Sequence, residues 1–331
     1  MDLEMLRERA RILRRVRSFF DERDYLETDT PLLAPDLIPE SCLEVFETTR
    51  LPPAGSRAVP KPYWLVPSPE VWMKQLIARH NTSIYQICKC FRNGESSGNQ
   101  HSPEFTMLEY YTMEADYHDS LALTEDLFDY LLKSTASQNN LNPPFIKLTV
   151  EEAFSKWAGF DLYKTAISRD GMEEEARRLG LDPIPNLSVP DLYDLIFIHS
   201  VEPEIKLDKP VALIDYPAFV PCLAKKSPDK KTVERWELYA NGIELANCFT
   251  EETSADEVRC FFENEKAEKE KTAIVRHRVN GDYWKMFNTE KSAGAGKSFP
   301  QCSGVAMGLD RLIMILTGRK TLDGVLPFPM E

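Results

Sequence analysis

The chain has 331 residues, of which 43% are hydrophobic and 28% charged, and its formal net charge is −13. This length allows two domains of roughly 100–200 residues, or one large domain with an insertion, and it suffices to bury a core without disulfides or metals. We find no apolar run of the ~18 residues that a membrane-spanning helix needs, and residues 1–15 lack a secretory signal pattern. The acidic balance also argues against a broad basic face for nucleic acid.

The N-terminal third predicts a helix followed by strands. Leu6, Leu13, Val16 and Phe20 recur at helical spacing within residues 3–23, and the following Thr30-Pro31 ends that segment. Residues 51–62 contain four prolines and predict a loop. The next elements that we expect are strands over 63–66, 84–91 and 103–111, with a helix over 69–79 between the first two.

Residues 117–205 predict a mostly helical block with breaks at 142–144 and 181–190. This block contains little convergent polar chemistry, and we interpret it as an insertion in a catalytic domain that spans residues 1–331. Strands resume over 211–216, 233–240 and 243–249, and Asn241-Gly242 predicts a hairpin between the last two. A charged helix over 256–278, a strand over 304–308 and an apolar helix over 309–316 complete an α+β fold with a mainly antiparallel sheet flanked by helices.

Two sequence features suggest sites that we do not predict. Seven scattered cysteines indicate a reducing compartment, hence a cytoplasmic protein, and Cys88-Lys89-Cys90 lies in an apolar run that favours a strand core over a metal site. The segment SAGAGKS at 292–298 resembles a phosphate-binding loop, but the position that requires glycine is Lys291 and no apolar strand precedes it. We therefore expect a surface loop there.

Two predicted strands bring carboxylates and aromatic rings onto shared faces. Period-two alternation places Phe105, Met107, Glu109 and Tyr111 on one face of the strand 103–111, and the alternative is that this face points outward to solvent. The same period groups the side chains of residues 247, 249 and 251, which are Asn, Phe and Glu. Carboxylates for an ammonium and rings for its methylene stem make a plausible box for a lysine-like side chain.

A second pair of carboxylates, Glu237 and Glu244, lies on opposite arms of the predicted hairpin and could meet across it. Such a pair repels unless it shares a proton or a divalent ion. Strict alternation puts Glu244 and Asn247 on opposite faces, so a single site requires a β-bulge between them. Arg92 and Arg311 each follow a predicted strand, where an arginine can bind phosphate bidentately.

Three segments resemble motifs 1, 2 and 3 of the class II aminoacyl-tRNA synthetases, and the subtype resembles the lysyl enzymes. These segments are FFDERDYLETDTP (19–31), FRNGESSGNQHSPEFTMLEYY (91–111) and GVAMGLDR (304–311). The sequences GIELAN (242–247) and CSGVAMG (302–308) are closer to the stand-alone relatives of that catalytic core, the elongation factor P–lysine ligases. The chain also begins at the helix before motif 1, so we expect no anticodon-binding OB domain.

The resemblance implies an ATP- and Mg²⁺-dependent ligase that activates lysine or (R)-β-lysine and transfers it to elongation factor P. It implies two catalytic arginines, Arg92 and Arg311. For ATP it implies Arg92, Asn93, Gly94, Glu95, His101, Ser102, Phe105, Glu244, Leu245, Gly308 and Arg311. For the amino acid it implies Ser68, Pro69, Glu70, Glu109, Tyr111, Ala246, Asn247, Phe249, Glu251 and Ala306. Glu237 and Glu244 would bind Mg²⁺, and motif 1 implies a homodimer.

Several positions depart from the lysyl-tRNA synthetase pattern. Ala246 and Ala306 stand where those enzymes usually have glycine, and one added methyl changes discrimination by roughly 1–3 kcal/mol, in keeping with a preference for (R)-β-lysine. In motif 2, Gly94 is an extra residue before Glu95, and Gln100 replaces the arginine that precedes the histidine.

Two other functions stay open at this stage. The first is a truncated synthetase-like enzyme with another acceptor, although the acidic charge argues against tRNA. The second is a regulatory paralogue that binds lysine or ATP without catalysis, for which the missing motif 2 arginine is the best support.

Overall fold

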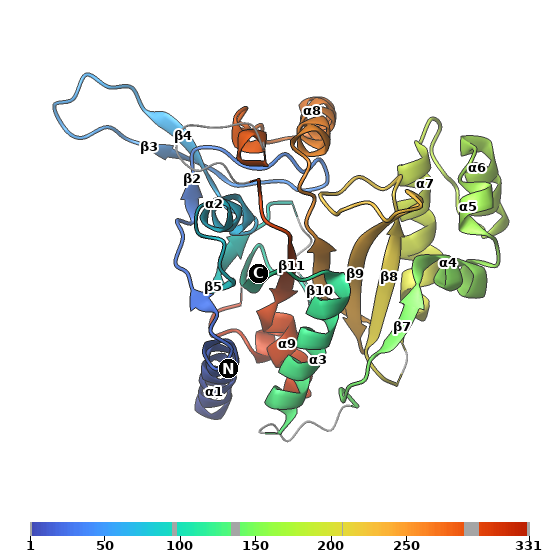
Figure 1. Ribbon diagram of the computed structural model, residues 1–331, viewed down its shortest axis with the longest axis horizontal. Helices are drawn as coiled ribbons and strands as arrows, with labels where there is room; N and C mark the ends of the chain where they lie inside the picture. The colour runs from blue at the N-terminus through green and yellow to red at the C-terminus, as the bar shows by residue number, and fades with distance from the viewer. Residues whose placement is uncertain (1, 95–97, 134–139, 207, 288–297, 330–331) are drawn as a thin grey trace.

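An eight-stranded sheet forms the centre of the molecule (Figure 1). The computed structural model describes residues 2–94, 98–133, 140–206, 208–287 and 298–329. The strand order is β1-β5-β6-β11-β10-β9-β8-β7, antiparallel throughout except for the edge pairs β1/β5 and β7/β8. The strands are β1 (Leu26–Glu27), β5 (Ile84–Phe91), β6 (Glu104–Met113), β7 (Ile146–Thr149), β8 (Val211–Pro217), β9 (Thr232–Ala240), β10 (Ile243–Thr250) and β11 (Cys302–Gly308). The mainly antiparallel α+β fold expected from the sequence is confirmed.

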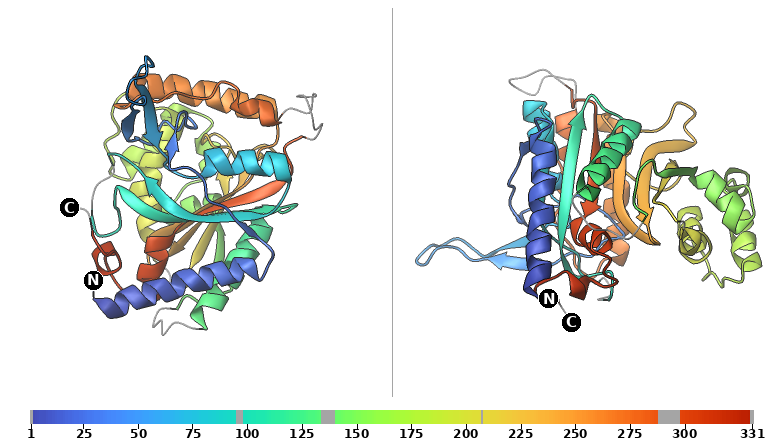
Figure 2. Two further views of the ribbon diagram at one scale, coloured as in Figure 1. Left: turned by 90° about the vertical axis from the view of Figure 1, so that its left-hand side faces the viewer. Right: turned by 90° about the horizontal axis from the view of Figure 1, so that it is seen from below.

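Three helices cover one face of this sheet: α1 (Leu3–Asp21), α3 (Tyr117–Leu132) and α9 (Leu309–Leu316) (Figure 2). The apolar stripes of these helices pack on inward-facing strand residues such as Trp236, Val305 and Met307, all less than 1% exposed. The opposite face is covered by α2 (Glu70–His80), α8 (Ala255–Thr272) and a smaller sheet, leaving a hollow between them and β6–β11–β10–β9. Strand side chains that alternate away from the core therefore line that hollow.

The Asn241-Gly242 hairpin and the end of α8 show how local chemistry sets element boundaries. Asn241 and Gly242 have φ values of 54° and 74°, the left-handed pair that a tight two-residue hairpin requires. The charged helix predicted over 256–278 ends at Thr272 instead. Beyond it, the Glu44 carboxylate accepts hydrogen bonds from the backbone N–H groups of Ile274 and Val275, which takes these amides out of the helical pattern.

The region 117–205 is less uniform than its sequence pattern suggests. Helix α3 packs into the main core, and β7, a strand that we did not predict, extends the main sheet. The remaining segments form a separate cluster that packs on β8 and β9. It contains α4 (Val150–Ala153), α5 (Leu162–Thr165), α6 (Arg169–Arg178) and α7 (Val189–Ile196), with π-helical turns at Phe154–Ala158 and Phe197–Val201.

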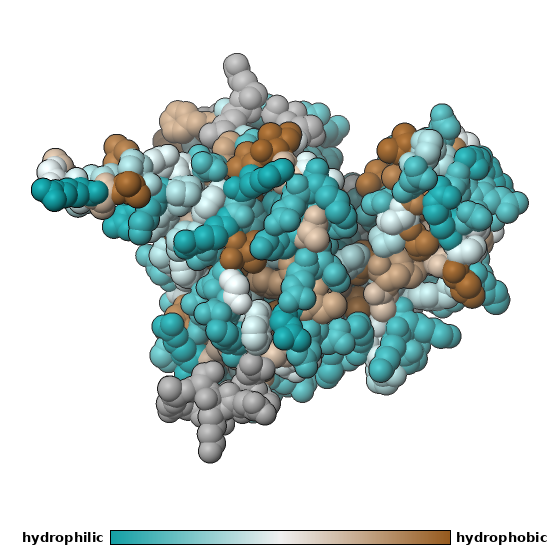
Figure 3. Space-filling model, turned by 90° about the horizontal axis from the view of Figure 1, so that it is seen from above, coloured by the Kyte–Doolittle hydropathy of each residue, from teal (hydrophilic) through white to brown (hydrophobic). Residues whose placement is uncertain are grey.

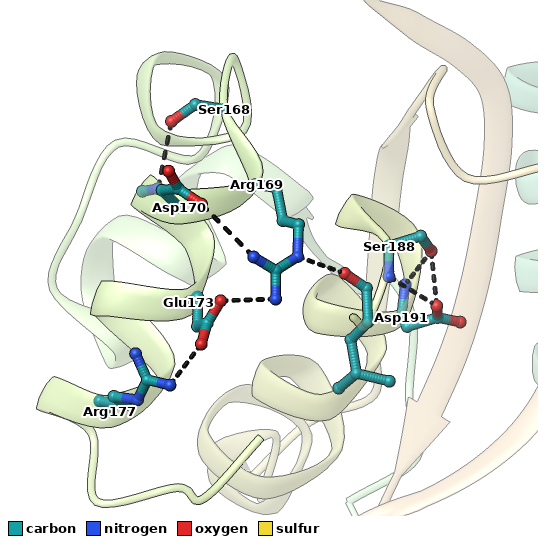
Figure 4. Close-up of polar contacts among 9 residues, drawn as sticks. Ser168, Arg169, Asp170, Glu173, Arg177, Ser188 and Asp191 are labelled. Carbon is teal, nitrogen blue, oxygen red and sulfur yellow. Dashed lines mark hydrogen bonds and ion pairs between the residues drawn. The ribbon is translucent and has the colours of Figure 1, made fainter. Parts of the chain in front are cut away.

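Polar contacts fix α6 and α7 to each other (Figure 4). The Arg169 guanidinium donates to the Leu187 carbonyl oxygen at 3.0 Å and forms an ion pair with Glu173 at 2.6 Å. Ser188 and Asp191 form a capping box at the start of α7. We described this region as an insertion, and its limits as a domain stay a prediction.

The smaller sheet projects from the body as a ribbon made of β2 (Leu33–Ala34), β3 (Glu47–Arg50) and β4 (Lys61–Leu65) (Figure 1). Its connecting loop exposes Leu51 and Val59, which are 73% and 70% accessible. On the face drawn in Figure 3, hydrophobic residues form small groups in a mostly hydrophilic surface. Scattered exposed apolar residues of this kind are ordinary and indicate no binding face by themselves.

One buried carboxylate ties three distant parts of the chain together beneath the sheet. Asp310, at the start of α9, accepts hydrogen bonds from the Arg9 guanidinium of α1 at 2.5 Å and from the Thr106 backbone N–H of β6 at 2.6 Å. Arg9 also donates to the Thr106 hydroxyl at 3.0 Å. Because Asp310 is only 2% exposed, its charge requires these partners.

Candidate active site

The hollow on the open face of the main sheet is a cavity of about 540 Å³. Its floor is formed by β6, β9, β10 and β11, and its walls include the segment 38–43 and part of α8. Among the predicted site residues, those that line it are Ser68, Glu70, Arg92, His101, Ser102, Phe105, Glu109, Tyr111, Glu237, Glu244, Leu245, Ala246, Asn247, Phe249, Glu251, Ala306, Gly308 and Arg311. The structure therefore brings residues of motifs 2 and 3 together with Ser68, Glu70 and residues of β9 and β10.

Three predicted site residues lie beside the cavity without lining it, and a fourth, Glu95, lies outside the described residues. Pro69 is buried at the start of α2, where its carbonyl accepts hydrogen bonds from Trp72 and Met73. Asn93 accepts from the Gly94 backbone N–H through its side-chain oxygen at 2.9 Å. The extra motif 2 residue, Gly94, has a φ of 73°, a conformation that favours glycine. Glu95 and positions 292–297 of the rejected phosphate loop lie outside the described residues.

One end of the cavity contains the predicted carboxylate box. Glu109 and Glu251 are each 2% exposed, and the Tyr111 hydroxyl donates to Glu109 Oε1 at 2.8 Å. A Cβ added at Gly304 would lie 2.5 Å from both Glu251 Oε1 and Tyr111 Cε1, so glycine is required for their side chains to meet over β11. The shared faces predicted for 105–111 and 247–251 are thus confirmed.

The box also contains an internal cation that the sequence analysis missed. Lys74 on α2 is 1% exposed, and its Nζ lies 2.5 Å from Glu70 Oε1 and 2.6 Å from Glu251 Oε2. Burial would lower the pKa of Lys74, but the charges of Glu251 and Glu70 outweigh this and hold the pKa above its ordinary value.

Burial dominates the acid–base state of both glutamates. It raises the pKa of Glu251 to about 7 despite the opposing charge of Lys74. Burial, together with the charge of Glu70, raises the pKa of Glu109 well above its ordinary value. Burial thus raises the pKa of both carboxyls, although the box already holds one ammonium.

The other end of the cavity is cationic and less enclosed. Arg92 and Arg311 are both half-buried, and the Arg92 guanidinium carbon lies 5.3 Å from the centre of the Phe105 ring. Arg311 donates to the backbone oxygens of Gln100 and Glu244, each at 3.0 Å, which fixes its guanidinium at the start of α9. An aromatic ring with two arginines suits the base and phosphates of a nucleotide.

The predicted bulge is present in β10, where the pairing with β9 shifts register between Glu244 and Ala246. Glu244 faces Tyr239 and Asn247 faces Glu237, so the bulge brings both carboxylates and Asn247 to the cavity side. Burial, followed by the negative charge of Glu237, raises the pKa of Glu244 to about 7.

Glu237 already accepts several hydrogen bonds. The Tyr216 and Tyr239 hydroxyls donate to its Oε2 at 2.6 and 2.8 Å, and Arg235 donates to its Oε1 at 2.5 Å. Arg235 also donates to Asn247 Oδ1 at 3.2 Å, which links this carboxylate to the amino-acid end of the cavity.

The two alanines of interest differ in position. Ala306 on β11 lies opposite Glu109 on one side and Asn247 on the other, on the cavity face. Ala246 lies opposite Leu238 and Met307, whose side chains belong to the core beneath the sheet. The Ala306 methyl thus faces the carboxylate box directly.

Sequence reasoning missed several charged residues of this site, and two of them had a local signal. Lys74 follows Glu70 by four residues on a predicted helix, a spacing that favours an ion pair. Arg235 precedes Glu237 by two residues on β9, which places both on one face. In both cases the spacing identifies a pair of residues close in sequence. The third partner, Glu251 for Lys74 and Asn247 for Arg235, comes close only in the folded chain.

The sequence matches the family described as tRNA synthetases class II (D, K and N) over residues 3–331. It is 35% identical to the elongation factor P–(R)-β-lysine ligase of Avibacterium paragallinarum, an alignment that covers 99% of this chain and 96% of that protein. Proteins of the same name in Haemophilus influenzae strain PittGG and Proteus mirabilis are each 34% identical, over 100% and 98% of this chain and 96% and 94% of theirs. The chain belongs to the class II tRNA synthetase family.

Class II synthetase motifs now have defined places in the fold. Motif 1 spans the end of α1 and β1, motif 2 leads from β5 into β6, and motif 3 joins β11 to α9. None of the helices in the described segments is long and apolar enough to span a bilayer. The described residues also contain no cluster of three or more metal-ligating side chains.

Proposed function

We propose that the chain activates lysine or (R)-β-lysine with ATP and transfers it to a lysine side chain of elongation factor P. The observation that carries this proposal is a single cavity with arginines at one end and three carboxylates, Glu70, Glu109 and Glu251, at the other. The similarity to proteins named elongation factor P–(R)-β-lysine ligase supports the choice of amino acid and acceptor.

The cationic end would bind ATP. Phe105 stacks on the adenine, with Arg311 on the opposite side and near the γ-phosphate, and Arg92 contacts the α-phosphate and the substrate carboxylate. The predicted nucleotide residues Ser102, His101, Leu245 and Gly308 line the same end. We propose that Asn93, Gly94 and Glu95 also contribute to ATP binding.

The acidic end would bind the two amines of the amino acid. Glu70, with Ser68 and Pro69 beside it, takes the amine nearer the carboxylate, and Glu109, Tyr111 and Glu251 take the distal ammonium. Phe249 and Asn247 line the path between them. The Ala306 methyl then limits the space around the substrate. Ala246, in the same part of the sheet, packs with the core residues Leu238 and Met307.

Glu237 and Glu244 fit a Mg²⁺ ion that also contacts phosphate. Both are hard oxygen donors on one side of the cavity, and the raised pKa of Glu244 indicates a buried carboxylate that would gain from a nearby cation. When bound, the ion would neutralise charge on the triphosphate. The hydrogen bonds of Glu237 to Tyr216, Tyr239 and Arg235 would hold its carboxylate in position.

The reaction then needs little acid–base catalysis. An oxygen of the substrate carboxylate attacks the α-phosphorus, the bond to the β-phosphate oxygen breaks, and pyrophosphate leaves. The acceptor lysine amine attacks the acyl carbon of the adenylate, loses a proton, and AMP leaves. Arg92 and Arg311 contribute by fixing the reactants and stabilising charge on the phosphates.

Pyrophosphate exchange with lysine and with (R)-β-lysine tests the first step, and transfer to purified elongation factor P tests the second. Exchange without transfer to the factor would favour another acceptor, and binding without exchange would favour a non-catalytic paralogue. Ala306→Gly should improve the use of α-lysine relative to β-lysine by about tenfold, because it removes one methyl from the box. We also propose a homodimer through motif 1, which light scattering on the full chain would test.

A further inference from the structure

Lys74 is the internal ammonium of the acidic end, and it differs from the lysines of the surface ion pairs by being buried. Its Nζ lies between Glu70 Oε1 and Glu251 Oε2, at 2.5 and 2.6 Å, and the side chain is 1% exposed. It does not line the cavity. It therefore acts on the cavity through the two carboxylates that it contacts.

The contacts leave specific oxygen atoms for a ligand. Lys74 engages Oε2 of Glu251, while Oε1 of the same carboxylate lies over Gly304 on the cavity floor. Glu109 Oε1 accepts from Tyr111, while its Oε2 is buried without a hydrogen-bond partner in the described part of the chain. A buried carboxylate oxygen without a donor is costly. In the free protein the raised pKa of Glu109 offsets this cost through protonation, and a cation that arrives with the substrate would replace that proton.

The charges give the same result. When a cationic ligand is bound, its ammonium groups favour the ionised forms of Glu109 and Glu251, which burial disfavours in the free protein. Glu70, Glu109 and Glu251 together with the Lys74 ammonium then carry two net negative charges. A diamino acid brings two ammonium groups and neutralises them, whereas an amino acid with one amine leaves a buried carboxylate unpaired.

We propose that Lys74 is a positioning residue that holds the carboxylates of Glu70 and Glu251 in place, so that the acidic end accepts an amino acid with two ammonium groups. This inference rests on the proposed function, because it assigns Glu70, Glu109 and Glu251 to the amines of the substrate. It assigns a role to a residue outside the cavity: by contacting one oxygen of each carboxylate, Lys74 determines which carboxylate oxygens can bind the substrate.

The test compares Lys74→Met and Lys74→Arg with Lys133→Met in pyrophosphate exchange. Lys133 is a matched control because it also pairs with an acidic residue four positions earlier on a helix, Asp129, but is exposed. Lys74→Met should raise the KM for lysine or β-lysine at pH 7 by about 30-fold or more, as expected when one partner of a buried charge pair is lost. The KM for ATP should change less than about twofold, and Lys133→Met should match the wild type.

The pH dependence of amino-acid affinity distinguishes a positioning role of Lys74 from a general loss of structure in the variant. Lys74 faces Glu70 on its own helix, Glu251 after β10, Tyr283 in a short helical turn, Cys302 on β11, and, further away, Glu109 on β6. Its positive charge lowers the pKa of Glu251, so Lys74→Met should raise that pKa and leave the carboxyl protonated at neutral pH. Amino-acid affinity in Lys74→Met should therefore recover as the pH rises, whereas Lys74→Arg should keep the wild-type profile.

A double variant covers the case in which Lys74→Met does not fold. Lys74→Met/Glu251→Gln removes both charges of one pair, while Glu70 still loses its contact with Lys74. Its amino-acid KM should therefore rise by less than the product of the two single effects. An unchanged amino-acid KM and pH profile in folded Lys74→Met would overturn the inference, as would single effects that simply multiply in the double variant. If the wild type activates no diamino acid, the proposed function fails instead.

Discussion

The two ends of the cavity bind charge in different ways. At the acidic end, Glu109, Glu251 and Lys74 are each at most 2% exposed, and each is fixed by a strand or helix of the core. At the cationic end, Arg92 and Arg311 are half-buried, and Arg311 is held by the backbone oxygens of Gln100, in a connecting segment, and of Glu244 on β10. A buried end discriminates between ligands because any unpaired charge is costly there. A more open end suits a large ligand such as ATP, whose charged phosphates bind strongly to arginines.

The largest expected effect is at the cationic end. Arg92→Ala should lower the rate of pyrophosphate exchange by about 10²–10³-fold, because a donor that stabilises charge on the reacting phosphate is lost. Arg169→Ala, in the α6–α7 cluster, is the control and should leave exchange unchanged (Figure 4). Normal exchange in Arg92→Ala, with a defect only in transfer to the acceptor, would contradict the role that we assign to it.

Two glycines of β11 lie at different ends of the cavity, Gly304 beside Glu251 and Gly308 beside Arg311, so a substitution at each tests one end. A Cβ at Gly304 would lie 2.5 Å from Glu251 Oε1, whereas a Cβ at Gly308 would lie 3.6 Å from its nearest neighbour, Arg311 Cδ. Gly304→Ala should therefore raise the amino-acid KM by at least about tenfold, as overpacking costs roughly 1–3 kcal/mol. Gly308→Ala should have a smaller effect, confined to ATP. If either variant changed the KM for the amino acid and the KM for ATP equally, the two ends of the cavity would not bind separate substrates.

Proton release on amino-acid binding tests how the acidic end is charged. Burial raises the pKa of Glu251 to about 7 and that of Glu109 well above its ordinary value, so both bind protons in the free protein below pH 7. A bound ammonium favours the ionised forms, and lysine binding at pH 6 should release about one proton or more per site. Release should be smaller at pH 8.5, where Glu251 is already ionised.

Calorimetry in two buffers of different ionisation enthalpy measures this release directly. Glu109→Gln removes one of the two titrating groups and should reduce the release at pH 6. A release that is independent of pH, or unaffected by the glutamine variant, would mean that these carboxyls are already ionised in the free protein.

The smallest effect is expected far from the cavity. Glu173 pairs with Arg169 and Arg177 on α6, and both arginines are exposed enough for water to screen the pairs. Glu173→Gln should lower the free energy of unfolding by roughly 1 kcal/mol or less and leave exchange unchanged. A large loss of activity would show that the α6–α7 cluster communicates with the cavity.

Period-two alternation predicted the floor of the cavity because the strands that form it are long and regular. Glu109 with Tyr111, and Asn247 with Glu251, could be placed on shared faces from spacing alone, and the bulge at Leu245 followed from requiring one site. The two-residue strands β1 and β2 gave no such pattern, and β7 was hidden in a helical region. Short edge strands are set by their neighbours, which a local pattern does not contain.

Interactions between distant segments were the other limit. The pair of Lys74 with Glu251 joins α2 to the end of β10, and no spacing rule connects residues so far apart in sequence. The end of α8 at Thr272 likewise depends on the distant Glu44 carboxylate. Resemblance to a known family identified the role expected of Glu251, but only the fold revealed its internal partner.

The contacts of Asp310 have a consequence for how the protein is made. Asp310 lies 301 residues from Arg9 and 204 from Thr106, and it joins α1, β6 and α9 where the cavity begins. During synthesis this junction can therefore close only after Asp310 has left the ribosome, long after α1 and β6. Because these contacts join residues so far apart in sequence, we expect the junction to form late in folding.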